Sequence, residues 1–230
     1  MSFKGFPRAG LAFLAELEDN NTKEWFEAHR SEHTTLLMEP AKDFVVAVGE
    51  RLQSISPHIY YDTKTNGTGT LLRIYRDTRF SHDKSPIKTN ISGMFWEGGG
   101  KKMERPGFGF QLEAAALRLM GGQFNFPKDF LEIYRQYVDI DRSGNELVTI
   151  LGEIQRKGDY TVNGDASSRV PAGYDADHPR AELLKYKGLW CSTSIEDIDV
   201  ITSPDLPDIA VGHFRNVAPL QQWLAGLLVA

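Results

Sequence analysis

The spacing of apolar residues changes near residue 63, and this change constrains the fold more than any other feature of the sequence. Up to Ser56, apolar side chains recur every three or four residues, which is the period of an amphipathic helix. Beyond a loop at residues 63–69, apolar and polar residues alternate, which is the period of a strand with one buried face. Helices and strands in separate stretches of chain, rather than in alternation, predict an α+β fold.

Three helices are expected in the first quarter of the chain. The first covers residues 7–18, and the second begins at Asn21, which resembles a capping box with Glu24. Pro40 is expected to interrupt the second helix, because proline lacks an N–H group and clashes with the preceding turn. The third helix then runs to Ser56. The first two helices should form a hairpin.

Alternating residues predict several short strands. The first two are expected at residues 72–75 and 87–95, paired with each other, and the next at residues 108–112 and 116–120. A last strand is expected at residues 189–193. Because these strands follow one another with short connections, a mainly antiparallel sheet is the simplest arrangement.

Further helices are predicted at residues 127–137, near residues 147–154, and after Pro204 or Pro207. A chain of 230 residues is long enough to bury one substantial core. We therefore expect a single domain, 1–230, in which a helical N-terminal hairpin and flanking helices pack on the sheet.

The composition limits the classes of partner. The net charge of -5 disfavours nucleic-acid binding through the overall field, without excluding a local basic patch. No apolar stretch approaches the length of a membrane-spanning helix, and the first residues lack the apolar core of a secretory signal. The single cysteine, Cys191, lies in an apolar run and is expected to be a buried, inert thiol. A cytoplasmic protein is expected.

Residues 73–88 concentrate charge at a strand end and the loop that follows it. The segment holds five cations, which are Arg73, Arg76, Arg79, Lys84 and Lys88. Arginine forks suit carboxylate or phosphate oxygens, and lysine adds a point charge, so the segment predicts an anion-binding site. In the alternative interpretation, Asp77 and Asp83 pair with Arg76, Arg79 and Lys84 in an internal network that is purely structural.

A second polar cluster spans residues 169–187. His178 could transfer a proton near neutral pH, with Asp175 or Asp177 orienting its ring. In the alternative interpretation, Asp177 caps a helix that begins near Pro179, and His178 packs at its start.

Dedicated metal and nucleotide sites are not predicted. His29 and His33 are four residues apart, and His82, Asp83 and His178 could converge, but the sequence has no HExxH, CxxC or EF-hand motif. We expect His29 and His33 to be surface residues rather than metal ligands. The sequence also lacks a P-loop and a GxSxG elbow, and no motif identifies a cofactor.

Several segments together resemble an uncharacterised family catalogued as domain of unknown function 2461, over nearly the whole chain. They are Asn20 and Asn21, Trp25 and Phe26, residues 73–88, Gly121 and Gly122, Gly173 and Tyr174, Asp177 to Pro179, Lys187, Pro219 and Leu220, and Trp223 and Leu224. The resemblance implies membership of a family, but it supplies no reaction, cofactor or catalytic residue.

These observations favour a protein that binds a small phosphate- or carboxylate-bearing ligand. The residues expected to hold the anion are Arg73, Arg76, Arg79, Lys84, Lys88 and Lys187. If the protein is an enzyme, Asp83 or His178 moves a proton. The alternative is a non-catalytic module for a nucleotide, nucleic acid or protein partner, with the charged clusters serving as structural ion-pair networks. The sequence leaves the question of catalysis open.

Overall fold

The computed structural model describes residues 2–77, 79 and 83–228. Its sheet has six strands in the order β1-β2-β3-β4-β6-β5, and each neighbouring pair is antiparallel. The strands are β1 (Ile59–Tyr60), β2 (Ile91–Glu97), β3 (Gly107–Leu112), β4 (Leu117–Gln123), β5 (Thr161–Asn163) and β6 (Leu189–Ile195). The predicted α+β fold with a mainly antiparallel sheet is confirmed.

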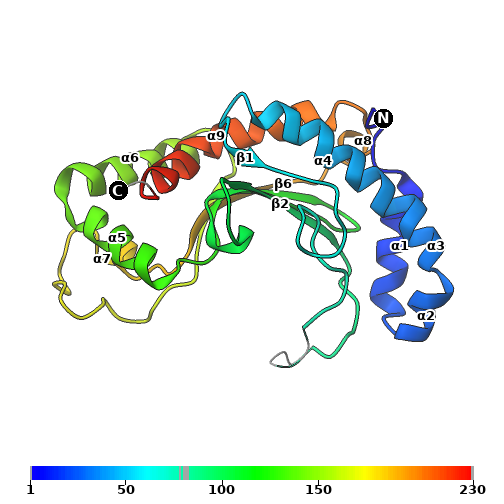
Figure 1. Cartoon of the computed structure of the whole chain (residues 1–230), viewed down its shortest axis with the longest axis horizontal. Helices are drawn as coiled ribbons and strands as arrows, with labels where there is room; N and C mark the ends of the chain where they lie inside the picture. The colour runs from blue at the N-terminus through cyan, green and yellow to red at the C-terminus, as the bar shows by residue number, and fades with distance from the viewer. Residues whose placement is uncertain (1, 78, 80–82, 229–230) are drawn as a thin grey trace.

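Helices precede, separate and follow the strands in the sequence, and several of them cover one face of the sheet (Figure 1). They are α1 (Arg8–Asp19), α2 (Lys23–Ala28), α3 (Arg30–His33), α4 (Glu39–Leu52), α5 (Lys128–Asp139), α6 (Asp141–Arg156), α7 (Ala181–Leu184), α8 (Ile198–Ile201) and α9 (Leu206–Gly226), with a π-helix η1 (Thr34–Met38) and a 3₁₀ helix η2 (Lys102–Glu104). Figure 1 shows α4, α6 and α9 in a layer above the sheet, and α1 to α3 at one end.

The core lies between this helical layer and the sheet. The ring of Phe108 in β3 lies 5.2 Å from that of Phe214 in α9. At Gly121 in β4, a Cβ atom would come within 2.5 Å of the Val217 side chain. Glycine at this position therefore lets α9 lie close against β4.

The opposite face of the sheet is more polar. The register places Ser92, Gln111, Arg118 and Ser194 side by side across four strands, and none of them is buried. Because side chains alternate between the two faces of a strand, these residues point away from α9. In Figure 1, chain segments descend from both ends of the sheet on this side.

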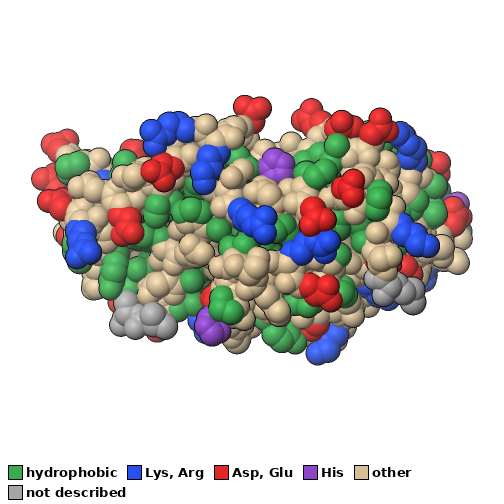
Figure 2. Space-filling model, turned by 90° about the horizontal axis from the view of Figure 1, so that it is seen from above, with side chains coloured by type: hydrophobic (Ala, Val, Ile, Leu, Met, Phe, Trp, Pro, Cys, Tyr) green, Lys and Arg blue, Asp and Glu red, His purple; other side chains and the backbone are tan. Residues whose placement is uncertain are grey.

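The helix-covered face has a mixed charge. Figure 2 shows Lys and Arg side chains interspersed with Asp and Glu side chains over this surface. The described residues in this view form no extended basic surface of the kind that binds a nucleic-acid backbone. None of the helices in the described part of the chain has the length and apolar character needed to cross a bilayer.

Two predictions for the N-terminal helices were wrong. Thr22, rather than Asn21, caps α2, because its side chain accepts a hydrogen bond from the backbone N–H of Trp25. Pro40 does not interrupt a helix. It lies in the first turn of α4, just after the π-helix η1, where the N–H group of Glu39 donates to the carbonyl of Thr34. This wider turn accommodates the proline, and η1 connects α3 to α4 directly.

The strand predicted at residues 72–75 is also wrong, because no continuous ladder forms there. The ends of this region make isolated bridges instead, one to Gly93 and one to Ile87. Four positions separate Leu71 from Tyr75, whereas six separate Gly93 from Ile87, so the two segments change register between the bridges and cannot form a regular ladder. The second predicted strand accordingly begins at Ile91, later than expected.

Candidate functional site

The two charged clusters lie at opposite ends of the sheet and do not meet. Residues 70–72 hydrogen-bond to β2, through the N–H groups of Leu72 and Met94, each at 2.9 Å. Lys187 instead lies just before β6, where its ammonium is 3.0 Å from Asp165. Since β3 and β4 separate β2 from β6, Lys187 does not join the anion-binding residues predicted at 73–88 (Figure 1).

A short hairpin positions the first cluster. Tyr75 bridges to Ile87, and the N–H group of Arg76 donates to the carbonyl of Pro86 at 3.0 Å. With this register, Arg76 and Lys88 lie diagonally opposite each other on one face of the hairpin. The local pairing therefore brings two of the predicted ligand-binding residues together.

Lys88 is half-buried, and its side chain has no partner in the part of the chain that the structure describes. Its ammonium makes no hydrogen bond or ion pair with any residue that the structure describes. Burial lowers the pKa of Lys88 from its usual value, and the nearby charge of Arg76 lowers it further. Both effects disfavour the protonated form, so a bound anion would relieve them.

Lys102, which was not among the predicted ligand-binding residues, joins these residues from η2. Burial lowers its pKa, Asp62 opposes this shift, and the charges of Lys88 and Arg73 add to it. The ammonium of Lys102 donates to the carbonyl of Gly69. We define Arg76, Lys88 and Lys102 as the cationic cluster.

Asp83, one of the two predicted acid–base residues, pairs with Arg76 of the same hairpin. Its carboxylate accepts a hydrogen bond from the guanidinium of Arg76. It also accepts from the backbone N–H of Ser85 at 2.9 Å and from the Ser85 hydroxyl at 2.6 Å. These contacts tie Asp83 to Ser85 and connect it to the cationic cluster.

Two predicted anion ligands lie on the exposed part of the loop. Arg79 pairs with Asp77 at 2.7 Å, and this hydrogen bond lowers the pKa of Asp77 to about 2. Lys84 is exposed. Neither side chain belongs to the cationic cluster, and His82 lies outside the described residues.

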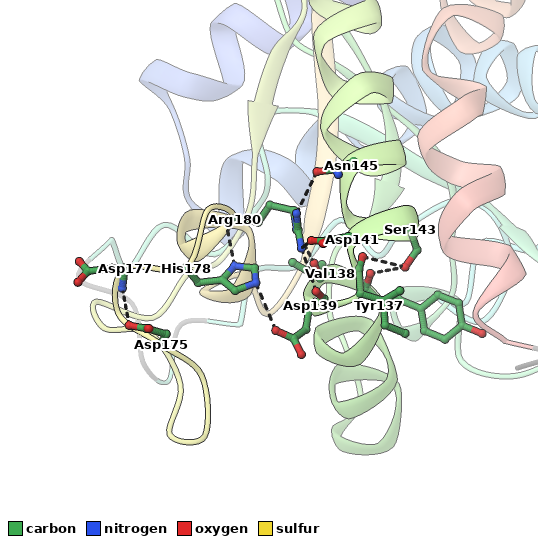
Figure 3. Close-up of polar contacts among 11 residues, drawn as sticks. Tyr137, Val138, Asp139, Asp141, Ser143, Asn145, Asp175, Asp177, His178 and Arg180 are labelled. Atoms are coloured by element: carbon green, nitrogen blue, oxygen red, sulfur yellow. Dashed lines mark hydrogen bonds and ion pairs between the residues drawn. The ribbon is translucent and has the colours of Figure 1, made fainter.

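His178 contacts the junction between α5 and α6 (Figure 3). Its Nε2 atom is 3.2 Å from the carboxylate of Asp139, and its Nδ1 atom accepts from the backbone N–H of Arg180 at 3.0 Å. The predictions that Asp175 or Asp177 orients His178 and that Asp177 caps a helix were wrong. The backbone N–H of Asp177 instead donates to Asp175, and α7 begins only after Arg180, without a side-chain cap.

Arg180 gives the second polar cluster a structural role, because its side chain links this loop to α5 and α6. The side chain is only 6% exposed and donates to the backbone carbonyls of Val138 and Asp139, at 2.7 and 2.9 Å. It also donates to the side chains of Asn145 and Asp141, at 2.9 and 2.8 Å (Figure 3). A buried arginine thus satisfies carbonyls at the end of α5 and ties the loop to α6.

The structure also bears on the predictions for the cysteine, for metal sites and for the pair of histidines. Cys191 is buried, as predicted, and burial raises its pKa to about 12. Within the described ranges, no group of three or more His, Cys, Asp or Glu side chains is placed to hold a metal ion. The prediction that His29 and His33 are both surface residues was wrong, because His33 is buried beside Phe26.

Comparison with known proteins identifies a family but no activity. The family described as conserved hypothetical protein (DUF2461) matches residues 9–223, and the chain belongs to this family. The resemblance found in the sequence is thus confirmed. No curated protein matches the chain. What the protein binds must therefore be inferred from its side chains.

Proposed function

We propose that this member of the DUF2461 family binds a small phosphate- or carboxylate-bearing ligand at the cationic cluster of Arg76, Lys88 and Lys102. The observation that carries the proposal is the half-buried ammonium of Lys88, which has no partner among the described residues. Burying an unpaired charge destabilises a fold, so such a group is usually kept for a binding role.

The neighbours of Lys88 strengthen this interpretation. Arg76 and Lys102 bring two further positive charges toward it from separate segments of the chain. Like charges held together repel one another, and an anion offsets the repulsion. A guanidinium and two ammonium groups also supply the donors that phosphate and carboxylate oxygens accept.

The alternative, a structural ion-pair network, accounts for only part of the region. Arg79 pairs with Asp77, and Arg76 with Asp83. Lys88 stands outside these pairs. Of the two predicted acid–base residues, Asp83 adjoins the cluster through Arg76, whereas His178 contacts the α5–α6 junction at the other end of the sheet.

Thermal unfolding with pyrophosphate or citrate, at constant ionic strength, tests the proposal. A ligand that binds only the folded state stabilises it by about 2.7 kcal/mol at a concentration of 100 times Kd. We expect this stabilisation in the wild type and its loss in Lys88→Met and Lys102→Met. Lys101→Met is the matched control, because Lys101 is an exposed neighbour that pairs with Glu104 at 3.1 Å.

The stability of the ligand-free variants separates the two interpretations. If Lys88 serves a ligand, Lys88→Met should unfold at a higher temperature than the wild type without anion, because it removes an unpaired half-buried charge. The proposal would be refuted if Lys88→Met unfolds at a lower temperature than the wild type and anions do not stabilise the wild type. Lys88 would then have a structural role.

A further inference from the structure

A hollow of about 340 Å³ lies between the helical residues 30–42, which span α3, η1 and the start of α4, and residues 65–75. Its described lining includes Arg30, His33, Lys42 and Arg73, and it contains no Asp or Glu. Lys88 and Lys102 do not line it, so the hollow is distinct from the cationic cluster. Its volume lies at the small end of the range for sites that bind small molecules.

His33 contributes a buried polar group to this hollow. It is only 4% exposed, and its ring lies 5.1 Å from that of Phe26 and 5.9 Å from that of Phe13. The imidazole makes no hydrogen bond with any described residue. Burial, with a further contribution from the charge of Arg30, lowers its pKa to about 4. The neutral ring therefore offers one unused donor and one unused acceptor.

Arg73 contributes an unpaired positive charge. Its Nε atom donates to the carbonyl of Asn66 at 3.1 Å, while its two terminal nitrogens make no hydrogen bond with described residues. At Gly67, which has a φ of 86°, a Cβ atom would come within 2.5 Å of the Arg73 side chain. Glycine there allows the stem of Arg73 to lie across the loop, which holds the guanidinium in place.

The other cations of the lining already have partners. Arg30 donates to Glu27 at 2.8 Å and to the Tyr75 hydroxyl at 2.9 Å. Lys42 pairs with Glu39 at 2.7 Å. The charge that remains uncompensated is that of Arg73, which matches a ligand with one anionic group.

We propose that this hollow is a binding site for a small organic anion. Its carboxylate or phosphate pairs with the terminal nitrogens of Arg73, and a hydroxyl or similar polar group hydrogen-bonds to His33. The side chains of Leu72 and Ile74, which also line the hollow, contact the carbon skeleton between these groups. The two unpartnered polar groups and the apolar wall between them define this ligand class.

Imidazole NMR resonances test the proposal directly. The charged probes are 4-hydroxybenzoate and glycerol 3-phosphate, and their neutral counterparts are phenol and glycerol. We expect either charged probe, at concentrations up to about 10 mM, to shift the His33 resonances while leaving those of exposed His58 unchanged. Unchanged His33 resonances with both charged probes would overturn the proposal.

Variants then separate this hollow from the cationic cluster. Arg73→Gln changes an exposed side chain and should weaken binding of the charged probe, measured from the His33 resonances, about tenfold or more. Lys88→Met removes a residue of the other proposed site and should leave the affinity measured from the His33 resonances unchanged. His33→Leu should also abolish binding, and Arg73→Gln keeps the test informative if that variant does not fold. If Lys88→Met abolishes binding and Arg73→Gln does not, the probe occupies the cationic cluster and the proposal is wrong.

Discussion

The side-chain amide of Asn21 forms a pair of hydrogen bonds with the main chain of Ile87. Its oxygen accepts from the Ile87 N–H group at 3.0 Å, and its nitrogen donates to the Ile87 carbonyl at 2.8 Å. Asn21 lies at the turn between α1 and α2, 66 positions before Ile87 in the sequence. The pair therefore anchors the hairpin that carries Arg76 and Lys88 to the N-terminal helices.

Replacing Asn21 should loosen this anchor. We expect Asn21→Ala to reduce the free energy of unfolding by about 1–3 kcal/mol, because both main-chain groups of buried Ile87 lose their partners. Asn20→Ala is the matched control, since the Asn20 side chain donates to the carbonyl of Glu16 on the exposed end of α1. Denaturant titration measures both variants, and equal losses would contradict the anchoring role.

Arg180 should be far more sensitive to substitution than an exposed arginine nearby. We expect Arg180→Gln to lose about 3 kcal/mol of stability, because it leaves the carbonyls of Val138 and Asp139 unsatisfied in a buried junction. Arg142→Gln, on the exposed side of α6, should change stability by less than about 0.5 kcal/mol. A loss below about 1 kcal/mol in Arg180→Gln would show that the junction tolerates the change.

His33 should make the fold sensitive to acid. Its pKa is about 4 in the folded protein and 6.5 as the ordinary value, so the unfolded state binds the proton more tightly. The free energy of unfolding is therefore highest above pH 6.5 and falls by about 3 kcal/mol as the pH decreases toward 4. His33→Leu should lack this loss when the two proteins are titrated with urea at pH 7 and pH 4. Equal pH dependence of the two would exclude a titrating His33.

Cys191 should resist thiol reagents in the folded protein. It is the single cysteine of the chain, it is buried, and burial raises its pKa to about 12, so little reactive thiolate forms near pH 8. We expect colorimetric thiol titration to detect almost no reaction under native conditions and complete reaction in denaturant. Rapid stoichiometric labelling without denaturant would show that the thiol is accessible.

The helices that the sequence predicts best are those with a regular apolar face. The N-terminal helix expected at residues 7–18 matches α1, and the helix expected to open at Pro127 matches α5. Their apolar spacing reports directly on the buried face, and proline at the helix start gives a local signal. The error at Asn21 arose because Asn21 and Thr22 both suit a helix cap, and the contact of Asn21 with Ile87 leaves the role to Thr22. The error at Pro40 arose because the π-helix η1 before it was not predicted.

The α+β class, the order of most elements and the concentration of cations at residues 73–88 could be predicted without knowledge of the structure. These properties depend on local spacing and on composition. Only the tertiary structure decided which charges have partners. Asp83 pairs with Arg76, while Lys88 is left without a partner among the described residues and Lys102 approaches from a distant segment. Burial and pairing depend on contacts between remote residues, so no local pattern encodes them.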